Sequence, residues 1–201
     1  MKRFDCLKLL ASMIDAKTIV VANVGPISRE WNALRPSDAN LLQVNLGLCA
    51  AVGLGISVSL PQRQVVILDG DGNLLLNLAS LADMANQNLK NMVHIVLDNE
   101  AYEGGGGLRS ATGGKTDLSV IARGAGVPET CVVTTLEEFE SRARQSLNES
   151  GHRFIVAKVE KGSVANLPTI TLDGKEAKYR FARYIESTEG VQILRPRYTH
   201  I

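Results

Sequence analysis

Apolar residues are distributed along the chain in two alternating patterns, which predict strands and helices in turn. Short runs of aliphatic and β-branched residues, such as TIVVAN at 18–23 and QVVILD at 64–69, are typical of buried strands. Between the runs, apolar residues recur every three or four positions, as in 4–15, and indicate amphipathic helices. Because the strand runs are almost continuously apolar, both faces of the predicted sheet should be covered.

The predicted strands and helices alternate along almost the whole chain. The predicted strands are 18–23, 64–69, 92–98, 131–134 and 154–159, and the predicted helices are 4–15, 46–60, about 74–88, 117–124, 135–148 and 175–188. The sequence contains no internal repeat and no clear linker. We therefore expect one α/β domain spanning 1–201, with a mostly parallel sheet and helices on both faces.

Composition narrows the possible functions. Apolar residues make up 45% and charged residues 21% of the chain, as in ordinary globular proteins. A net charge of +1 and an aromatic content of 4% do not favour binding to nucleic acid or to a membrane surface. The longest apolar run, 46–60, is too short to span a bilayer. Cys6, Cys49 and Cys131 form no metal-binding motif, so the predicted location is the reducing cytoplasm.

Three unusual loops follow predicted strands. They are NVGPIS at 23–28, GDGN at 70–73 and DNEAYEGGGG at 98–107. In sheets of this kind, ligands bind beyond the carboxyl ends of the strands. We therefore expect the three loops to form one site.

Asp71 lies between two glycines at the end of a predicted buried strand. The glycines permit a sharp turn and close approach of the backbone to a ligand, and the start of the next helix suits a phosphate. A carboxylate repels phosphate unless a cation lies between them, and Mg²⁺ binds both kinds of oxygen. Asp71 is therefore predicted to be a metal ligand, with Asn99 as the second. Either residue taken alone is also compatible with a simple turn, so the prediction rests on the pair.

The sequence GDGN…DN, with a helix and a strand between its parts, resembles the GDG–NN motif of thiamine diphosphate enzymes. The resemblance implies that Asp71, Asn99 and the carbonyl of Ala101 bind Mg²⁺, which holds the diphosphate of the cofactor. It also implies that Gly72 and Asn73 contact the diphosphate. Asp98 stands where the first asparagine of the motif is usual, but that position is not a metal ligand.

Further cofactor contacts are implied by the same resemblance. VNLGLCAAVGLG looks like the family segment in which a bulky aliphatic side chain holds the cofactor in a bent, V-shaped conformation. Leu46 is the candidate for that side chain, with the carbonyl of Val44 facing the aminopyrimidine. Without the motif, Leu46 would read as an ordinary core leucine. The loops complete the expected cofactor-binding set with Gly25, Ser28, Gly70 and Tyr102.

Within the family, the segments NVGPISREW, LDGDGNLLLNL, LDNEAY and KYRFARYIESTEG resemble a particular group. It comprises the small subunits of sulfopyruvate decarboxylases and the C-terminal halves of phosphonopyruvate decarboxylases. The implied reaction converts a short anionic 2-oxo acid, such as 3-sulfopyruvate or phosphonopyruvate, into an aldehyde and CO₂. Arg29, Arg109 and Lys115 are candidates to bind the sulfonate or phosphonate, although each is also a plausible surface charge. The segment 103–115 is interpreted either as a lid or as a surface loop.

Thiamine diphosphate enzymes also need a second domain, whose glutamate activates the cofactor. This chain has room for the diphosphate half only, so the resemblance implies no catalytic residue here. It implies instead a companion subunit with the pyrimidine-binding domain, in a hetero-oligomer. Two alternatives stay open. One is a β subunit of another thiamine diphosphate enzyme, either a 2-oxo acid oxidoreductase or an acetolactate synthase-like enzyme; the other is a non-catalytic cofactor-binding module.

Four other side chains carry simpler expectations. His94 lies within a predicted strand and is expected to be a hydrogen-bonded core residue. His152 and His200 are expected at the surface, and Trp31 is a candidate for packing at a subunit interface.

Overall fold

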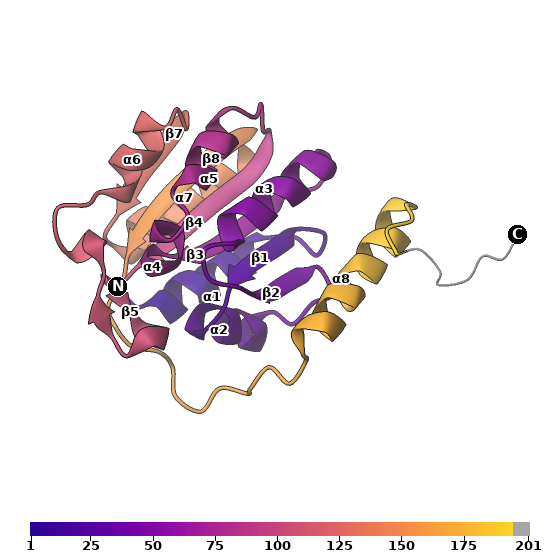
Figure 1. Cartoon of the computed structure of the whole chain (residues 1–201), viewed down its shortest axis with the longest axis horizontal. Helices are drawn as coiled ribbons and strands as arrows, with labels where there is room; N and C mark the ends of the chain where they lie inside the picture. Colours follow the sequence, from indigo (N-terminus) through magenta and orange to yellow (C-terminus); the bar gives the residue numbers. More distant parts are fainter. Residues whose placement is uncertain (195–201) are drawn as a thin grey trace, which may run out of the picture.

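A computed structural model describes residues 1–194 and arranges them around a six-stranded sheet (Figure 1). The strands are β1 (Ile19–Asn23), β2 (Asn40–Val44), β3 (Val65–Gly70), β4 (Asn91–Asp98), β7 (Glu129–Val133) and β8 (Gly151–Lys158), in the order β2-β1-β3-β4-β8-β7. All neighbouring strands in this sheet are parallel. Two short antiparallel strands, β5 (Ala101–Tyr102) and β6 (Leu108–Arg109), form a separate hairpin. The expected fold class is confirmed.

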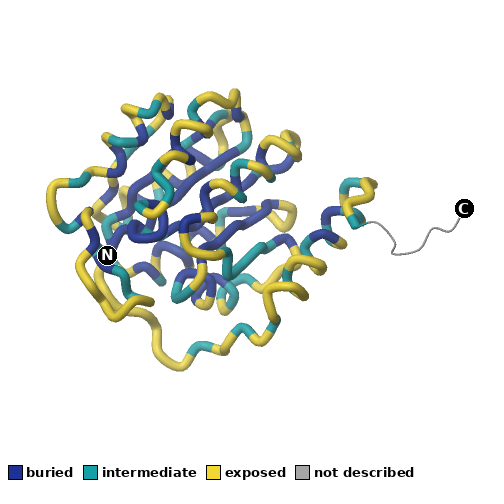
Figure 2. Tube along the Cα trace, in the orientation of Figure 1, coloured by how far each residue is buried: buried dark blue, intermediate teal, exposed yellow. Residues whose placement is uncertain are grey.

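Helices cover both faces of the sheet, because successive strand residues point to opposite sides. On one face, Val20 and Ala22 of β1 pack with helices α1 (Arg3–Met13), α2 (Pro26–Leu34) and α7 (Leu136–Asn148). On the other face, Ile19 and Val21 belong to the cluster that includes α3 (Cys49–Ser59), α4 (Asp71–Leu75), α5 (Ala79–Ala85), α6 (Leu118–Gly124) and α8 (Gly174–Glu189). Figure 2 shows the resulting buried layer between more exposed helices. Within residues 1–194, no helix is long and apolar enough to cross a membrane.

The strand order reverses at β1. The chain passes from β1 to β2 on one side and then returns to place β3 on the other side of β1. The carboxyl ends of β1 and β3 therefore lie next to each other, and the loops that follow them leave the sheet in different directions. A crevice at such a reversal is the usual ligand site of an open parallel sheet.

The structure differs from the sequence-based expectation at three elements. The helix expected at 74–88 is divided into α4 and α5, because the backbone N–H of Asn77 bonds to Leu74 three residues back. The side chain of Asn77 also donates to the carbonyl of Gly47 at 2.9 Å. Helix α2 and edge strand β2 were not predicted. The proline at the start of α2 was an available signal, whereas β2 is only half-buried and therefore weakly patterned.

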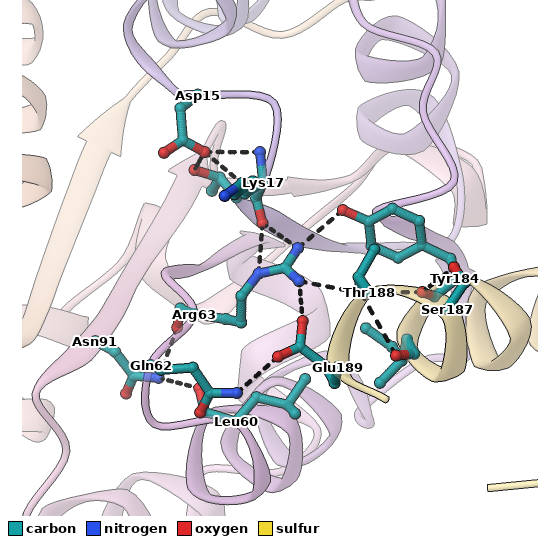
Figure 3. A network of polar contacts seen from close by, with 12 residues as sticks. Asp15, Lys17, Leu60, Gln62, Arg63, Asn91, Tyr184, Ser187, Thr188 and Glu189 are labelled. Atoms are coloured by element: carbon teal, nitrogen blue, oxygen red, sulfur yellow. Dashed lines mark hydrogen bonds and ion pairs between the residues drawn. The ribbon is translucent and has the colours of Figure 1, made fainter. Parts of the chain in front are cut away.

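Helix α8 is held against the end of the sheet by Arg63 (Figure 3). The Arg63 guanidinium donates to the carbonyl of Lys17, to the hydroxyl of Tyr184 at 2.8 Å and to the hydroxyl of Thr188 at 3.2 Å, and it pairs with Glu189. Because Arg63 precedes β3, these contacts lie at the amino ends of the strands. They fix the C-terminal end of α8 at the side of the sheet opposite the three loops, while the helix itself runs beside edge strand β2.

The positions of the histidines and of Trp31 can be compared with the remaining expectations. His94 is fully buried, 3.4 Å from Asp69 and edge-on to Phe154, as expected of a core residue. The surface expectation for His152 was wrong, because β8 begins at Gly151 and directs His152 inward, leaving it 3% exposed. The expectation that Trp31 packs at a subunit interface was wrong, because its side chain is fully buried in the core of its own chain. His200 lies outside the described residues.

We expect acid to destabilise the protein through His152. Burial, aided by His94, lowers the pKa of the His152 imidazole from 6.5 to about 3. Below pH 6.5 the unfolded chain binds a proton that the folded chain excludes, so stability present above that pH is lost as the pH falls toward 3. One unit below the ordinary value, the loss should be about 1.4 kcal/mol.

Urea unfolding of the wild type and of His152→Leu at pH 7.5 and pH 5.5 measures this loss. The variant should lose less stability than the wild type between the two pH values. An equal pH dependence in both proteins would contradict the assignment.

Candidate functional site

A cavity of about 430 Å³ opens at the carboxyl ends of β1, β3 and β4. It is lined by Asn23–Ile27 at the end of β1, by Gly70–Asn73 at the end of β3, and by Leu97, Asn99 and 101–105 at and beyond the end of β4, together with Arg3 and Leu46. The three loops that were expected to form one site therefore meet at one cavity. The cavity lies at the strand reversal between β1 and β3, where the topology favours ligand binding.

Asp71 begins α4 and is 2% exposed. Its Oδ2 atom accepts hydrogen bonds from the hydroxyl of Ser110 and, at 3.0 Å, from that of Thr112. Thr112 Oγ1 also lies 2.8 Å from Oδ1 of Asp98. Burial is the main cause that raises the pKa of Asp71; the charge of Asp98 adds to it, while the hydroxyl hydrogen bonds oppose it.

The number of hydroxyl protons in this network is too small for its contacts, which favours a bound cation. Ser110 and Thr112 supply one hydroxyl proton each, yet they make three contacts with the carboxylate oxygens of Asp71 and Asp98. Two carboxylates are thus buried close together, and the two hydroxyls have too few protons to donate in all three contacts. A bound cation such as Mg²⁺ would offset this negative charge, so the residues fit the metal that the motif implies.

The other expected metal ligands lie on the turn after β4. Asn99 is 6% exposed, and its Oδ1 accepts the N–H of Ala101 at 3.1 Å. Between them, Glu100 adopts a left-handed backbone conformation with φ of 60°. Asn99 and Ala101 line the same cavity as Asp71. The structure therefore brings together the three residues expected to bind the metal.

Lys158, at the end of β8, pairs with the acidic residues on either side of Asn99. Its Nζ lies 2.7 Å from Asp98 and 3.3 Å from Glu100. Burial alone would lower the pKa of Lys158, but the two carboxylates outweigh it and raise this pKa. The ammonium group is therefore charged, and it balances part of the buried negative charge.

Six of the residues expected to bind the cofactor also line the cavity. They are Gly25, Leu46, Gly70, Gly72, Asn73 and Tyr102. A Cβ atom at position 72 would lie 2.5 Å from the ring of Tyr102, so only glycine allows this aromatic ring to pack against the motif. Leu46 is 61% exposed and is not an ordinary core leucine.

Asn73 positions neighbouring backbone. Its side chain accepts the N–H of Gly47 at 2.8 Å and donates to Asp69 at 2.5 Å. Gly47 has a positive φ of 76° and lies directly after Leu46. Asn73 therefore fixes the turn that presents Leu46 to the cavity.

Five expected site residues lie outside the cavity lining. The hydroxyl of Ser28 is buried beneath the first loop, where it donates to the carbonyl of Asn23 at 2.7 Å and accepts the N–H of Gln43. The carbonyl of Val44 accepts the N–H of Val24 at 2.8 Å. The other three are cationic and exposed: Arg29, Arg109 and Lys115.

Several residues of the site were not anticipated from the sequence. Asn23 ends β1 and lines the cavity, and its buried Oδ1 has no hydrogen-bond partner among residues 1–194. A polar residue at the end of an apolar strand was the signal for it. Ser110 and Thr112 contact Asp71 from about forty positions away, and no local pattern pointed to this contact.

The segment 103–115 contains ordered turns and strand β6. Glu103 pairs with Arg3 at 2.6 Å, and Ser110 bonds to Asp71. Arg3 also forms a buried pair with Glu30 at 2.8 Å. The glycine run 104–107 is exposed between these two fixed points.

The fold and cavity define an α/β domain that binds its ligand at a strand reversal, beside buried carboxylates. Residues 29–157 match the family described as "Thiamine pyrophosphate enzyme, C-terminal TPP binding domain". The chain belongs to this family.

Named relatives agree with this membership. The chain is 34% identical over 190 residues to the sulfopyruvate decarboxylase subunit beta of Methanocaldococcus jannaschii, covering 92% of this chain and 97% of that protein. It is 30% identical over 184 residues to the phosphonopyruvate decarboxylase of Streptomyces viridochromogenes, covering 91% of this chain and 46% of that protein.

A solved structure supports the fold. The thiamine diphosphate-dependent 4-hydroxybenzoylformate decarboxylase of Rhodococcus jostii RHA1 superposes with a TM-score of 0.67 at 20% identity. The match covers 82% of this chain and 33% of that protein. At this level of identity, the likeness supports the fold alone.

We expect Asp71→Asn to stabilise the protein in the absence of cation while removing its response to cation. The raised pKa of Asp71 means that its charged form is disfavoured by folding, so charge removal should increase the free energy of unfolding. Single stabilising substitutions commonly add ~0.5–2 kcal/mol. Addition of Mg²⁺ and thiamine diphosphate should raise the Tm of the wild type but not that of the variant.

Differential scanning calorimetry of both proteins, with and without the two ligands, measures these effects. Asp83→Asn, on the exposed surface of α5, is the matched control and should behave as the wild type. A ligand-induced rise in Tm that survives in Asp71→Asn would contradict the assignment.

Proposed function

We propose that residues 1–201 form the diphosphate- and Mg²⁺-binding subunit of a thiamine diphosphate-dependent decarboxylase. Its substrate is a short anionic 2-oxo acid such as 3-sulfopyruvate or phosphonopyruvate, and its products are the aldehyde and CO₂. The single observation that carries the proposal is the convergence of Asp71, Asn99 and Ala101 at one cavity between β1 and β3. The names of two relatives with near-complete alignment of this chain support the substrate class.

The proposed metal ligands are the Asp71 carboxylate, the Asn99 amide oxygen and the Ala101 carbonyl. Mg²⁺ commonly combines a few protein oxygens with phosphate oxygens, which suits this small set. Gly70 and Gly72 have no side chain to shield the backbone where the diphosphate would approach, and Gly25 has the same property on the facing loop. The main contribution of Asn73 to this site is its hydrogen bond to the N–H of Gly47.

Bound thiamine diphosphate would supply the electron sink for loss of CO₂ from the 2-oxo acid. The protein's task is to orient the reactants and to exclude water. Leu46 lines the cavity and is placed to support the bent cofactor. The Val44 carbonyl accepts one hydrogen bond, from the N–H of Val24, and keeps a second lone pair for the aminopyrimidine. Tyr102 packs its ring against Gly72 and lines the cavity next to the glycine run.

We infer that the activating glutamate belongs to a companion subunit with a pyrimidine-binding domain. The glutamates nearest the cavity are already engaged: Glu30 and Glu103 pair with Arg3, and Glu100 pairs with Lys158. Exposed apolar side chains at or beside the cavity lining offer a docking surface for that subunit in a hetero-oligomer. They are Val24, Leu46, Leu48, Leu76 and Leu108.

The anionic end of the substrate would lie toward this interface. Three cationic side chains are exposed and lie outside the cavity lining: Arg29, Arg109 and Lys115. We therefore propose that they can contact a sulfonate or phosphonate only in the assembled enzyme. The free cysteines of the chain are compatible with the cytoplasm as its location.

Two alternatives make different predictions. A β subunit of a 2-oxo acid oxidoreductase would purify with an iron–sulfur cluster in its complex, which an iron assay detects. A non-catalytic module would show no turnover, and unchanged cofactor binding by Asp71→Ala would weigh against the proposed metal role.

The proposed activity predicts Mg²⁺-dependent CO₂ release from 3-sulfopyruvate or phosphonopyruvate by the complex purified from its host on a tagged copy of this chain. Asp71→Asn should reduce the rate at least about a hundredfold, because the cation and the diphosphate lose their shared ligand. The isolated chain should release no CO₂ above background.

The exposed variant Asp83→Asn controls for the effect of substitution itself. A complex that contains thiamine diphosphate and a second chain but releases CO₂ from neither acid would exclude this substrate class. Full activity of the isolated chain would contradict the need for a companion subunit.

A further inference from the structure

Asp98 is a buried carboxylate immediately before the proposed metal ligand Asn99. It is 2% exposed, and such a charge is strongly destabilising unless it is paired and hydrogen-bonded. Its partners are the Lys158 ammonium at 2.7 Å, the Thr112 hydroxyl at 2.8 Å and the backbone N–H of Glu100 at 3.0 Å. Lys158 is the only one of these three partners that brings a positive charge.

The position of Asp98 determines the course of the turn that follows. Its side chain accepts the N–H of Glu100, whose left-handed backbone is unfavourable for a residue with a side chain. Across the turn, the carbonyl of Glu100 accepts the N–H of Ser110 at 3.0 Å. Asn99 lies between Asp98 and Glu100 in the chain. Its direction toward the cavity therefore depends on Asp98 remaining in place.

Asp98 is also linked to Asp71, because Thr112 Oγ1 contacts both carboxylates. If Asp98 lost its ammonium partner, two uncompensated carboxylates would face each other through one hydroxyl. The simplest relief is movement of Asp98 toward solvent, which would carry the adjacent Asn99 with it. Lys158 prevents this movement from a neighbouring strand, since Asp98 and Lys158 end β4 and β8 at the same register position.

We propose that Lys158 is a positioning residue, which holds Asn99 in its cation-binding orientation by pairing with the carboxylate of Asp98. The inference rests on the proposed function, because it concerns the same cation site. Lys158 is absent from the cavity lining and acts through Asp98. Its contact with the more exposed Glu100 is secondary.

The test is the affinity of the assembled complex for a divalent cation, measured directly with Mn²⁺ by electron paramagnetic resonance in the presence of thiamine diphosphate. Lys158→Met should weaken Mn²⁺ binding by about tenfold or more, the usual effect of losing a residue that orients a metal ligand. Removal of a positive charge would by itself tighten cation binding, so the two explanations predict opposite signs. Glu100→Gln is the matched control and should change the affinity less than about threefold.

The double variant Asp98→Asn/Lys158→Met removes both charges and keeps an acceptor at position 98. The decrease in the logarithm of the Mn²⁺ affinity, relative to the wild type, should be at most half as large in the double variant as in Lys158→Met. Unchanged or tighter binding by Lys158→Met, or recovery of less than half of its loss, would overturn the proposal.

If Lys158→Met does not fold, Asp98→Asn alone and the double variant provide the same test. With residue 98 neutral, loss of Lys158 should alter the affinity less than about threefold; a larger loss would show that Lys158 acts independently of Asp98. Asp71→Asn separates this inference from the proposed function. If it retains Mn²⁺ binding, the cation site itself is misassigned, whereas its loss together with an unaffected Lys158→Met overturns only the positioning role.

Discussion

The site depends on β1 and β3 ending side by side where the strand order reverses. Asn23 and Gly70 are neighbours there, and a Cβ atom at position 70 would lie 3.6 Å from the amide nitrogen of Asn23. The diverging loops leave room for a ligand that no side chain of the sheet fills. The parallel register then brings the end of β4 alongside, so that Asp71 and Asn99 reach one cavity from two successive strands.

This arrangement concentrates negative charge on side chains that are almost fully buried. Asp71 and Asp98 share Thr112, and the charge of Lys158 compensates for only part of their sum. A protein selected for stability alone would have little reason to keep the Asp71 carboxylate in a position where burial raises its pKa. A site that receives a divalent cation has such a reason, because the unfavourable charge becomes the source of affinity.

Much of this structure could be predicted from sequence, because its determinants are local. The apolar runs marked the central strands, and the Gly-Asp-Gly turn with Asn99 marked loops that meet at the cavity. Edge strand β2 was missed because its half-buried residues carry no clear period. His152 was misplaced since a polar neighbourhood concealed one inward-facing strand position. Ser110, Thr112 and Lys158 join the site through tertiary contacts, which no spacing along the chain records.

The same contacts restrict how the glycine-rich segment can move. Its start is fixed where Glu103 binds Arg3 and the N–H of Gly162, and its far side is fixed where Ser110 binds Asp71. Between these points the run 104–107 and Leu108 are exposed, but the N–H of Gly107 donates to the carbonyl of Tyr102 at 2.9 Å and Leu108 pairs with Tyr102 in the β5–β6 hairpin. A lid hinged at both ends of 103–115 would have to break the contacts to Asp71, the proposed metal ligand. The segment is therefore better understood as a fixed wall of the cavity, whose hairpin presents the exposed Leu108 toward the surface where a companion subunit would dock.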